Sequence, residues 1–224
     1  MFSITTYFQG PAVQLHRANT WQYNSLGYRT HEQVTEPHIV VSGCSHTEGV
    51  GLAEVEETWP RQLENKINTQ VINIGLGSSN AEFVSHNLAL WLDHYQPLAV
   101  IAQWPQVFRQ THWTKGYGDF TTPNKTDDLY KLKLLTGDEH FLLTFVKSVV
   151  YLDNKCKLNN IPVIHIHLDI PGPEKPLLEQ VGIEMHYDLK LPGNTWHFDS
   201  GALDGTHHSS WCHTQWVERI RKLL

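Results

Sequence analysis

Short apolar runs alternate four times with segments of helical periodicity along this chain, and this alternation restricts the fold more than any other feature. The apolar runs are His38–Ser42, Val71–Ile74, Leu98–Ala102 and Pro162–Leu168, each followed within a few residues by glycine or proline. Such runs are typical of buried strands, and strands that alternate with helices form parallel sheets through right-handed crossovers. We therefore predict an α/β fold, a doubly wound three-layer sandwich with a central, mainly parallel sheet of about five strands. Residues 183–189 are the candidate fifth strand.

The helical segments each carry one apolar face. The first, Thr58–Asn68, is helical in composition, and the pattern Ser79-Asn80-Ala81-Glu82 predicts a capping box at the start of the second. The apolar positions of the later helices are Val84, Leu88, Trp91 and Tyr95, then Leu142, Phe145, Val149, Leu152 and Cys156, and finally Val217, Ile220 and Leu224. Residues 104–137 show no clear period, and we expect a loop insertion there. We assign residues 1–35 to an N-terminal arm and 36–224 to one domain.

Composition narrows the class of protein. Hydrophobic residues make up 40% of the chain and charged residues 18%, which is typical of a folded domain. The 17 basic residues are outnumbered by 23 acidic ones, so the net charge of −6 disfavours nucleic acid as a partner. No apolar run approaches the roughly 18 residues of a membrane span, and Met1–Gly10 has no secretory pattern. Three scattered cysteines form no disulfide framework or zinc spacing. We expect a cytoplasmic protein.

Two polar motifs fall where a sheet of this type places its sites, beyond the carboxyl ends of the strands. Gly43-Cys44-Ser45 follows the first strand, and a serine there can expose its hydroxyl. Serine needs a base and an orienting group to act as a nucleophile. Asp204 and His207 lie three residues apart near the C-terminus, at the entry to the last helix, and can hydrogen-bond to each other. The two motifs together predict a catalytic triad of Ser45, His207 and Asp204.

These motifs resemble those of the SGNH (GDSL-like) hydrolase family and span residues 43 to 207. Gly43–Gly49 is similar to the first block, Gly-Asp-Ser-x-x-x-Gly, with Cys44 where Asp is usual, and Asp204-x-x-His207 matches the last block. Asn24–Arg29 also resembles a lead-in segment seen before the first block in some members. The resemblance implies an SGNH/flavodoxin-like sheet and a serine esterase or acyl-transfer activity.

The resemblance also implies an oxyanion hole. Asn73–Asn80 is similar to the second block, whose glycine N–H is a donor, and we choose Gly77 for that role, with Ser78 as the alternative. The third block departs from the family, because Gln103-Trp104-Pro105-Gln106 stands in place of Gly-x-Asn-Asp. Counting from the strand, Gln106 takes the position of the Asn donor, and Gln103 is the alternative. The predicted donors are therefore the N–H groups of Ser45 and Gly77 and the side chain of Gln106.

Two other groups of residues suggest different chemistry. Cys44 neighbours Ser45, but adjacent side chains at a strand edge point apart, so we expect Cys44 to be buried. His165, His167 and Asp169 alternate along one strand face at a spacing that metals accept. Because helices should cover both faces of this sheet, we expect His165 to be a hydrogen-bonded core residue. We predict no metal and no cofactor; a metal-dependent hydrolase is the weaker alternative.

Aromatic residues are frequent in the loops expected near the site: Trp104, Trp113, Tyr117, Phe120, Trp196 and Phe198. Flat rings there would suit a sugar or an acyl chain, and loop packing is the alternative. We name Trp104, Trp113 and Trp196 as candidate substrate contacts.

The sequence as a whole predicts a serine ester hydrolase acting on a small-molecule or carbohydrate ester, with a carbohydrate O-deacetylase as the preferred form. An O-acyltransferase and a non-catalytic binding or structural protein on the same fold are the alternatives, and nothing in the sequence indicates an oligomeric state.

Overall fold

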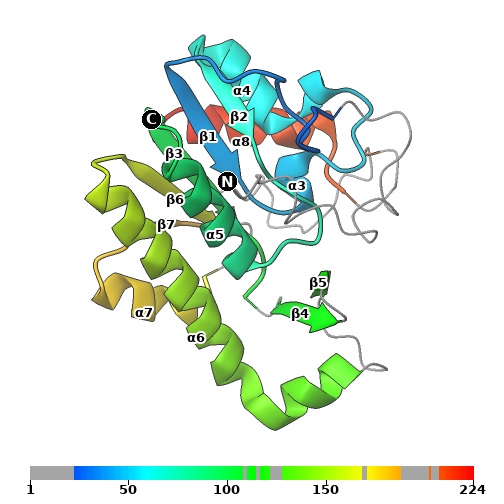
Figure 1. Cartoon of the computed structure of the whole chain (residues 1–224), viewed down its shortest axis with the longest axis vertical. Helices are drawn as coiled ribbons and strands as arrows, with labels where there is room; N and C mark the ends of the chain where they lie inside the picture. The colour runs from blue at the N-terminus through cyan, green and yellow to red at the C-terminus, as the bar shows by residue number, and fades with distance from the viewer. Residues whose placement is uncertain are drawn as a thin grey trace.

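The computed structural model describes residues 23–107, 110–114, 117–121, 128–167, 171–187, 202 and 207–224, with the backbone alone in 110–114, 117–121 and 128–136. Its strands are β1 (His38–Ser42), β2 (Gln70–Asn73), β3 (Ala99–Trp104), β4 (Gln110–Thr114), β5 (Tyr117–Thr121), β6 (Val163–His167) and β7 (Met185–His186). Its helices are α3 (Ser45–Glu48), α4 (Trp59–Ile67), α5 (Ala81–Leu92), α6 (Asp128–Leu158), α7 (Glu174–Gln180) and α8 (Ser210–Ile220), with a 3₁₀ turn η1 at Val55–Glu57. Figure 1 shows their arrangement.

The central sheet has five strands in the order β2-β1-β3-β6-β7, and every neighbouring pair is parallel. β1 lies between β2 and β3 in the sheet: Val41 is aligned with Asn73 of β2 on one side and with Ile101 of β3 on the other. The chain therefore leaves β1 for one side of the sheet and returns on the other. This confirms the predicted doubly wound sandwich with a parallel sheet of five strands.

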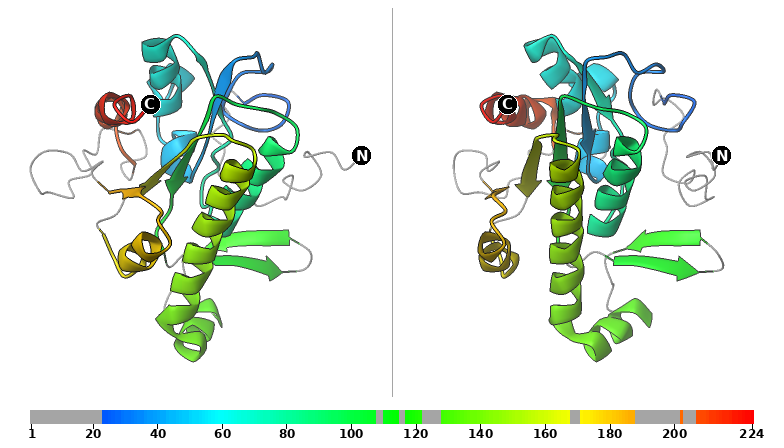
Figure 2. Two further views of the ribbon diagram at one scale, coloured as in Figure 1. Left: turned by 90° about the vertical axis from the view of Figure 1, so that its left-hand side faces the viewer. Right: turned by 60° about the vertical axis from the view of Figure 1, so that its left-hand side comes forward.

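Helices cover both faces of the sheet (Figure 2), and each face has its own apolar core. Alternate residues of each strand face opposite cores, as a period of two requires. Facing α5 and α6 are Val40, Ile72, Val100, Ala102 and Trp104, packed with Val84, Leu88, Phe145, Val149 and Leu152. Facing α4 and α8 are Ile39, Val41, Ile101 and Ile166, packed with Trp59, Leu63, Trp216, Val217 and Ile220. Each fully buried aliphatic side chain contributes about 1.5–3 kcal/mol, so the two cores hold the layers together.

The described part of the segment 104–137 differs from the expected loop. β3 continues to Trp104, β4 and β5 form a separate two-stranded antiparallel sheet, and α6 begins at Asp128. Within α6, Gly137 has φ 71°, a left-handed conformation that breaks the helix in two and that glycine adopts at little cost. Sequence periodicity missed the hairpin because β4 and β5 have no regular alternation of apolar and polar residues that would distinguish them from a loop.

The start of α5 also differs in detail from its prediction. Asn80, rather than Ser79, is the capping residue, and its side-chain oxygen accepts a hydrogen bond from the N–H of Phe83 at 2.9 Å. Ser79 Oγ instead donates to the carbonyl of Leu76 at 2.5 Å. The helix therefore begins one residue later than the capping-box pattern suggested, and Ser79 belongs to the turn that precedes it.

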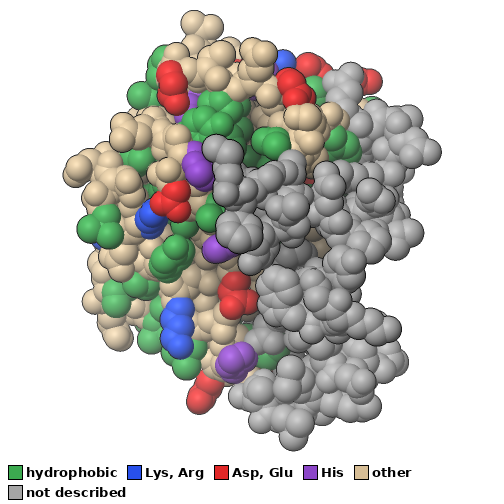
Figure 3. Space-filling view, viewed as in Figure 1, with side chains coloured by type: hydrophobic (Ala, Val, Ile, Leu, Met, Phe, Trp, Pro, Cys, Tyr) green, Lys and Arg blue, Asp and Glu red, His purple; other side chains and the backbone are tan. Residues whose placement is uncertain are grey.

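The surface of the described residues carries mixed charge. On the face shown in Figure 3, acidic and basic side chains of the described residues are scattered and form no continuous basic surface. Among the described residues, no helix is both long enough and apolar enough to cross a membrane.

Candidate active site

Ser45 is the first residue of α3, which begins just beyond the carboxyl end of β1. The turn into this helix needs Gly43, because a Cβ at that position would lie 2.0 Å from Thr47 Oγ1 and 2.9 Å from the Gln103 carbonyl oxygen. Gly49 ends the helix with φ 80°, and its N–H donates to the carbonyl of Ser45 at 2.9 Å. Ser45 is 8% exposed and Cys44 1% exposed, as expected for a packed cysteine. The sequence thus places Ser45 at the edge where the site was predicted.

A buried polar network fixes this turn to the neighbouring strands. Thr47 Oγ1 donates to Gln103 Oε1 of β3 in a very short hydrogen bond. Asn73 Nδ2, at the end of β2, donates to the Thr47 carbonyl at 2.8 Å, and Asn73 Oδ1 accepts from the N–H of Gly75 at 2.9 Å. The turn that carries Ser45 is therefore tied to the ends of both strands that flank β1.

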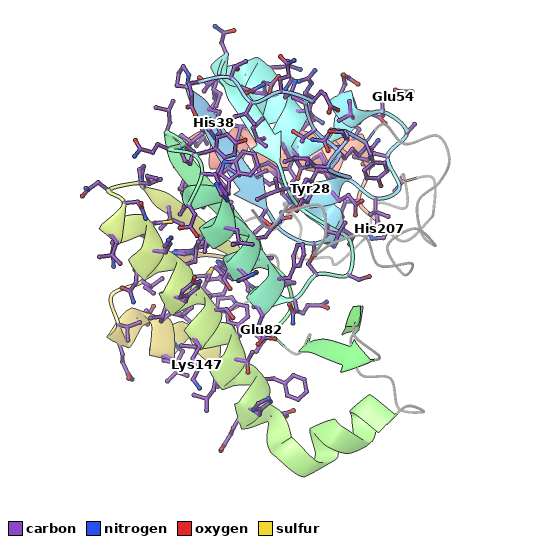
Figure 4. All side chains as sticks on the ribbon, viewed as in Figure 1. Tyr28, His38, Glu54, Glu82, Lys147 and His207 are labelled. Atoms are coloured by element: carbon purple, nitrogen blue, oxygen red, sulfur yellow. The ribbon has the colours of Figure 1, made fainter. Side chains whose placement is uncertain are left out.

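His207 lies beside this turn, although it comes from the opposite end of the chain (Figure 4). Its ring contacts that of His46, the residue after Ser45, edge to face, with ring centroids 5.5 Å apart. His46 also contacts His208, at 4.9 Å, and Trp216 of α8, at 5.9 Å. The structure thus brings the predicted base to the helical turn that begins with the predicted nucleophile.

Helix α8 is held in turn against α4. His213 Nδ1 accepts a hydrogen bond of 2.9 Å from the backbone N–H of Trp59, and the His213 ring lies 4.8 Å from Trp216. Both His213 and Trp216 are buried. The segment that carries His207 therefore leads into a helix whose position is fixed by α4.

The predicted oxyanion donors differ in their surroundings. The N–H of Gly77 donates to Glu48 Oε2 at 2.5 Å, so a carboxylate already binds it. Ser78 follows at an exposed position with φ 64°, a left-handed conformation unusual for serine. Gln106 is exposed, whereas Gln103 is fully buried and its Nε2 has no partner among the described residues. The Asn position predicted for Gln106 is thus open to solvent, and the alternative Gln103 lies within the network under Ser45.

The structure corrects the prediction for Trp104, which is fully buried and faces the core under α6 rather than the site. Its Nε1 donates to His165 Nδ1 at 3.1 Å. The error arose because β3 is longer than its apolar run, so Trp104 belongs to the strand and not to the following loop. Among the other candidates, Trp113 lies in β4, where only the backbone is described, and Asp204 and Trp196 lie outside the described residues.

His165 is a hydrogen-bonded core residue, as predicted. It is 3% exposed, and its Nε2 lies 3.5 Å from Asp153 Oδ1. Burial lowers the pKa of His165, with the Asp153 carboxylate acting against that shift. The same hydrogen bond lowers the pKa of Asp153. Because the indole of Trp104 donates to Nδ1, that nitrogen carries no proton, and the proton of the neutral ring is on Nε2. Among the described residues no cluster of histidine, cysteine and acidic side chains could hold a metal ion.

Sequence reasoning missed two residues of this region. His46 was not singled out, although its place directly after Ser45 put it at the site. Glu48 was not singled out either, because an acidic residue in a short helix is usually exposed, whereas this one is 4% exposed. The burial of Glu48 depends on contacts with residues distant in sequence, so no local signal could have found it.

The comparisons with known proteins concern the fold. No protein-family model matches the chain, and no curated protein matches it by sequence. Among solved structures, a protein assigned to the G-D-S-L family from Desulfitobacterium hafniense DCB-2 is 17% identical with a TM-score of 0.56, covering 84% of this chain and all of that one. The esterase EstA from Pseudoalteromonas, inhibited by monoethylphosphonate, is 15% identical with a TM-score of 0.53, covering 84% and 98%. A family two carbohydrate esterase from Clostridium thermocellum, in complex with cellohexaose, is 12% identical with a TM-score of 0.53, covering 85% and 64%. The chain thus has the fold of the SGNH/GDSL-like hydrolases.

Proposed function

We propose that the protein is a serine ester hydrolase in which Ser45 is the nucleophile, His207 the general base and Asp204 the group that orients His207. The observation that carries this proposal is the contact of the His207 ring with His46, the neighbour of Ser45 on α3. This contact puts an imidazole ring next to the turn at the carboxyl end of β1, where sites of doubly wound sheets lie. A fold shared with esterases adds support of a general kind.

In the proposed reaction, Ser45 Oγ attacks the ester carbonyl carbon while His207 accepts the hydroxyl proton. The tetrahedral intermediate then collapses, and His207 returns the proton to the departing alcohol. Water, activated by the same imidazole, attacks the acyl-enzyme and releases the carboxylic acid and free Ser45. Asp204 keeps the imidazole in the tautomer that accepts at the nitrogen facing Ser45 and stabilises the imidazolium.

Three groups are proposed to stabilise the oxyanion: the N–H of Ser45, a backbone N–H of the Gly77–Ser78 turn, and the side-chain amide of Gln106. The sequence favoured Gly77 over Ser78, and the hydrogen bond from Gly77 to Glu48 reopens that choice. Gln106 is exposed and can meet a substrate that arrives from solvent.

The proposed substrate is an O-acetylated carbohydrate, with Trp113 and Trp196 as contacts to the sugar. The similarity to a carbohydrate esterase solved with cellohexaose supports this class. Transfer of the acyl group to another alcohol uses the same acyl-enzyme, so analysis of the products with and without an acceptor sugar separates hydrolysis from transfer.

Labelling with a fluorophosphonate tests the proposal. Ser45 should be modified, and Ser45→Ala should abolish both the labelling and the hydrolysis of p-nitrophenyl acetate. Full labelling of Ser45→Ala would show that another residue is the nucleophile, and Cys44 would be the next candidate. An unlabelled and inactive wild-type protein that binds acetylated sugars would instead support a binding protein on this fold.

A further inference from the structure

Glu48 is a buried carboxylate that the proposed triad does not use. It closes α3, three residues after Ser45, and is 4% exposed. Its Oε2 accepts the N–H of Gly77 at 2.5 Å, and its Oε1 accepts the hydroxyl of Tyr23 at 2.8 Å. A single side chain therefore connects α3, which begins at Ser45, with the 76–79 turn and with Tyr23, the residue before the segment Asn24–Arg29.

A buried positive charge accompanies this carboxylate. Arg29 is 1% exposed and donates to the carbonyls of Gly49 and Leu52 at 2.5 and 2.9 Å. Burial lowers the pKa of Arg29, and the nearby Tyr23 and Glu48 act in the opposite direction. Buried carboxylates are tolerated where charged groups and hydrogen-bond donors surround them, and Glu48 accepts from two donors, the Gly77 N–H and the Tyr23 hydroxyl.

The turn that Glu48 holds is packed directly against the proposed nucleophile. A Cβ built on Gly77 would lie 2.9 Å from Glu48 Oε2 and 3.9 Å from Ser45 Cβ, so this position needs a glycine as long as Glu48 stays in place. The N–H of Ser79 donates to the Leu76 carbonyl at 3.2 Å and closes the turn. Ser78, its third residue, has the positive φ of a type II turn, where glycine is usual.

The bond from Gly77 to Glu48 decides which N–H of this turn is available. The N–H of Gly77 is already bound to Glu48 Oε2 at 2.5 Å, so a substrate would have to break that hydrogen bond in order to use it. The N–H of Ser78 makes no hydrogen bond among the described residues.

We propose that Glu48 is a positioning residue, whose carboxylate fixes Gly77 and thereby holds the 76–79 turn against Ser45 so that the Ser78 N–H serves as the second backbone donor. This inference rests on the proposed esterase function and extends it to the residue that builds the oxyanion site. Glu48 acts through the turn and makes no contact with the substrate.

Two substitutions of Glu48 test this role. Glu48→Ala removes the acceptor of Gly77 and should lower kcat for p-nitrophenyl acetate, and the rate of fluorophosphonate labelling of Ser45, by about 10²-fold, the usual cost of a misplaced catalytic group. KM should change less than about twofold, because the oxyanion forms only in the transition state. Glu48→Gln keeps an oxygen that can accept the Gly77 N–H and should retain most of the activity. Glu184→Ala, at an 83% exposed glutamate before β7, is the matched control.

Gly77→Ala disturbs the same contact through the other partner, because the added Cβ would lie too close to Glu48 Oε2. If the two residues act as one unit, the double variant Glu48→Ala/Gly77→Ala loses little more than either single variant. Hydrogen exchange at the Gly77 amide should be slow in the wild type and in Glu48→Gln, and fast in Glu48→Ala.

Labelling of the wild type separates the two proposals. If Ser45 of the wild type is not labelled, the esterase function fails and the role of Glu48 fails with it. If Ser45 is labelled but folded Glu48→Ala reacts at the wild-type rate, only the role of Glu48 is overturned. Equal losses in Glu48→Ala and Glu48→Gln would also overturn it, since a negative charge and not the bond to Gly77 would then be the essential feature.

Discussion

Two groups of histidines in this molecule have opposite surroundings. The core histidines, His38 and His165, are 0% and 3% exposed. Each accepts a hydrogen bond from a tryptophan indole at 3.1 Å, His38 from Trp91 and His165 from Trp104. The second nitrogen of each ring faces a carboxylate, at 3.0 Å for Glu36 and 3.5 Å for Asp153. Both rings are thus fixed in one tautomer with both nitrogens occupied.

The edge histidines, His46, His207 and His208, are partly exposed and contact one another through their rings. They come from two segments at opposite ends of the domain and meet only because α8 packs against α4 beside α3. Protonation of either core histidine would break the hydrogen bond that its ring accepts from an indole.

Spacing along a strand therefore says little about the role of a histidine. His165 and His167 alternate as metal ligands do, yet His165 is a packing residue of the sheet. The function of a histidine depends on the groups that face each ring nitrogen, and these come from elements distant in sequence.

Removing one histidine from each group should give the largest effects and tests whether the two groups differ in function. His207→Ala should lower kcat by roughly 10⁴-fold with little change in thermal stability, because it removes the proposed base from a partly exposed position. His165→Ala should lower the free energy of unfolding by about 2–3 kcal/mol, since it leaves a cavity and an unpaired buried indole N–H. Its kcat per folded molecule should stay near that of the wild type.

His208→Ala is the matched control for the edge, because it changes the neighbouring ring of the same cluster and should be mild. The double variant Ser45→Ala/His207→Ala should lose little beyond either single change. Nearly additive losses, or full activity in His207→Ala, would remove His207 from the mechanism and leave the two groups of histidines functionally alike.

Gln106 and Gln103 of the third block differ in the same way, one exposed and one buried, and their substitution should have smaller effects than that of His207. Gln106→Ala should lower kcat by about 10²-fold with KM little changed, as expected for the loss of one oxyanion donor. Gln106→Asn should retain more activity because it keeps the amide. Gln103→Ala should mainly lower stability, since Gln103 is buried and accepts from Thr47. A larger loss of kcat in Gln103→Ala, measured on folded protein, would make Gln103 the donor instead.

Much of the fold could be predicted because its signals are local. The strand His38–Ser42, the helical face from Val84 to Trp91 and the alternation of elements all follow from periodicity within short windows, and each is present in the structure. Periodicity did not predict α7, which has seven residues, too few to show a face. It also misplaced Trp104, because the end of β3 is set by its pairing with β6, where Trp104 aligns with His167.

The position of Ser45 could be predicted, because it lies in a turn between a strand and glycines that a motif can identify; its role as the nucleophile stays a prediction. The burial of Glu48 could not be predicted in this way, because it results from the approach of Gly77 and Tyr23, which are 29 and 25 residues away in sequence. Contacts of this kind depend on tertiary packing, which cannot be predicted from a short stretch of sequence.

The pH dependence of unfolding gives the smallest expected effect and tests the core histidines directly. Burial lowers the pKa of both His38 and His165, while Glu36 and Asp153 act against the shift. In the unfolded chain both rings have the ordinary pKa of about 6.5. Below that pH the unfolded state binds protons that the folded state does not, so the free energy of unfolding falls as the pH drops toward the lowered values. Each histidine contributes at most about 1.4 kcal/mol per pH unit in this window.

Denaturant unfolding between pH 7.5 and 5 measures the slope of the unfolding free energy against pH, and His165→Gln, which cannot be protonated, should make this slope shallower. A slope in His165→Gln as steep as that of the wild type would show that His165 does not contribute to it.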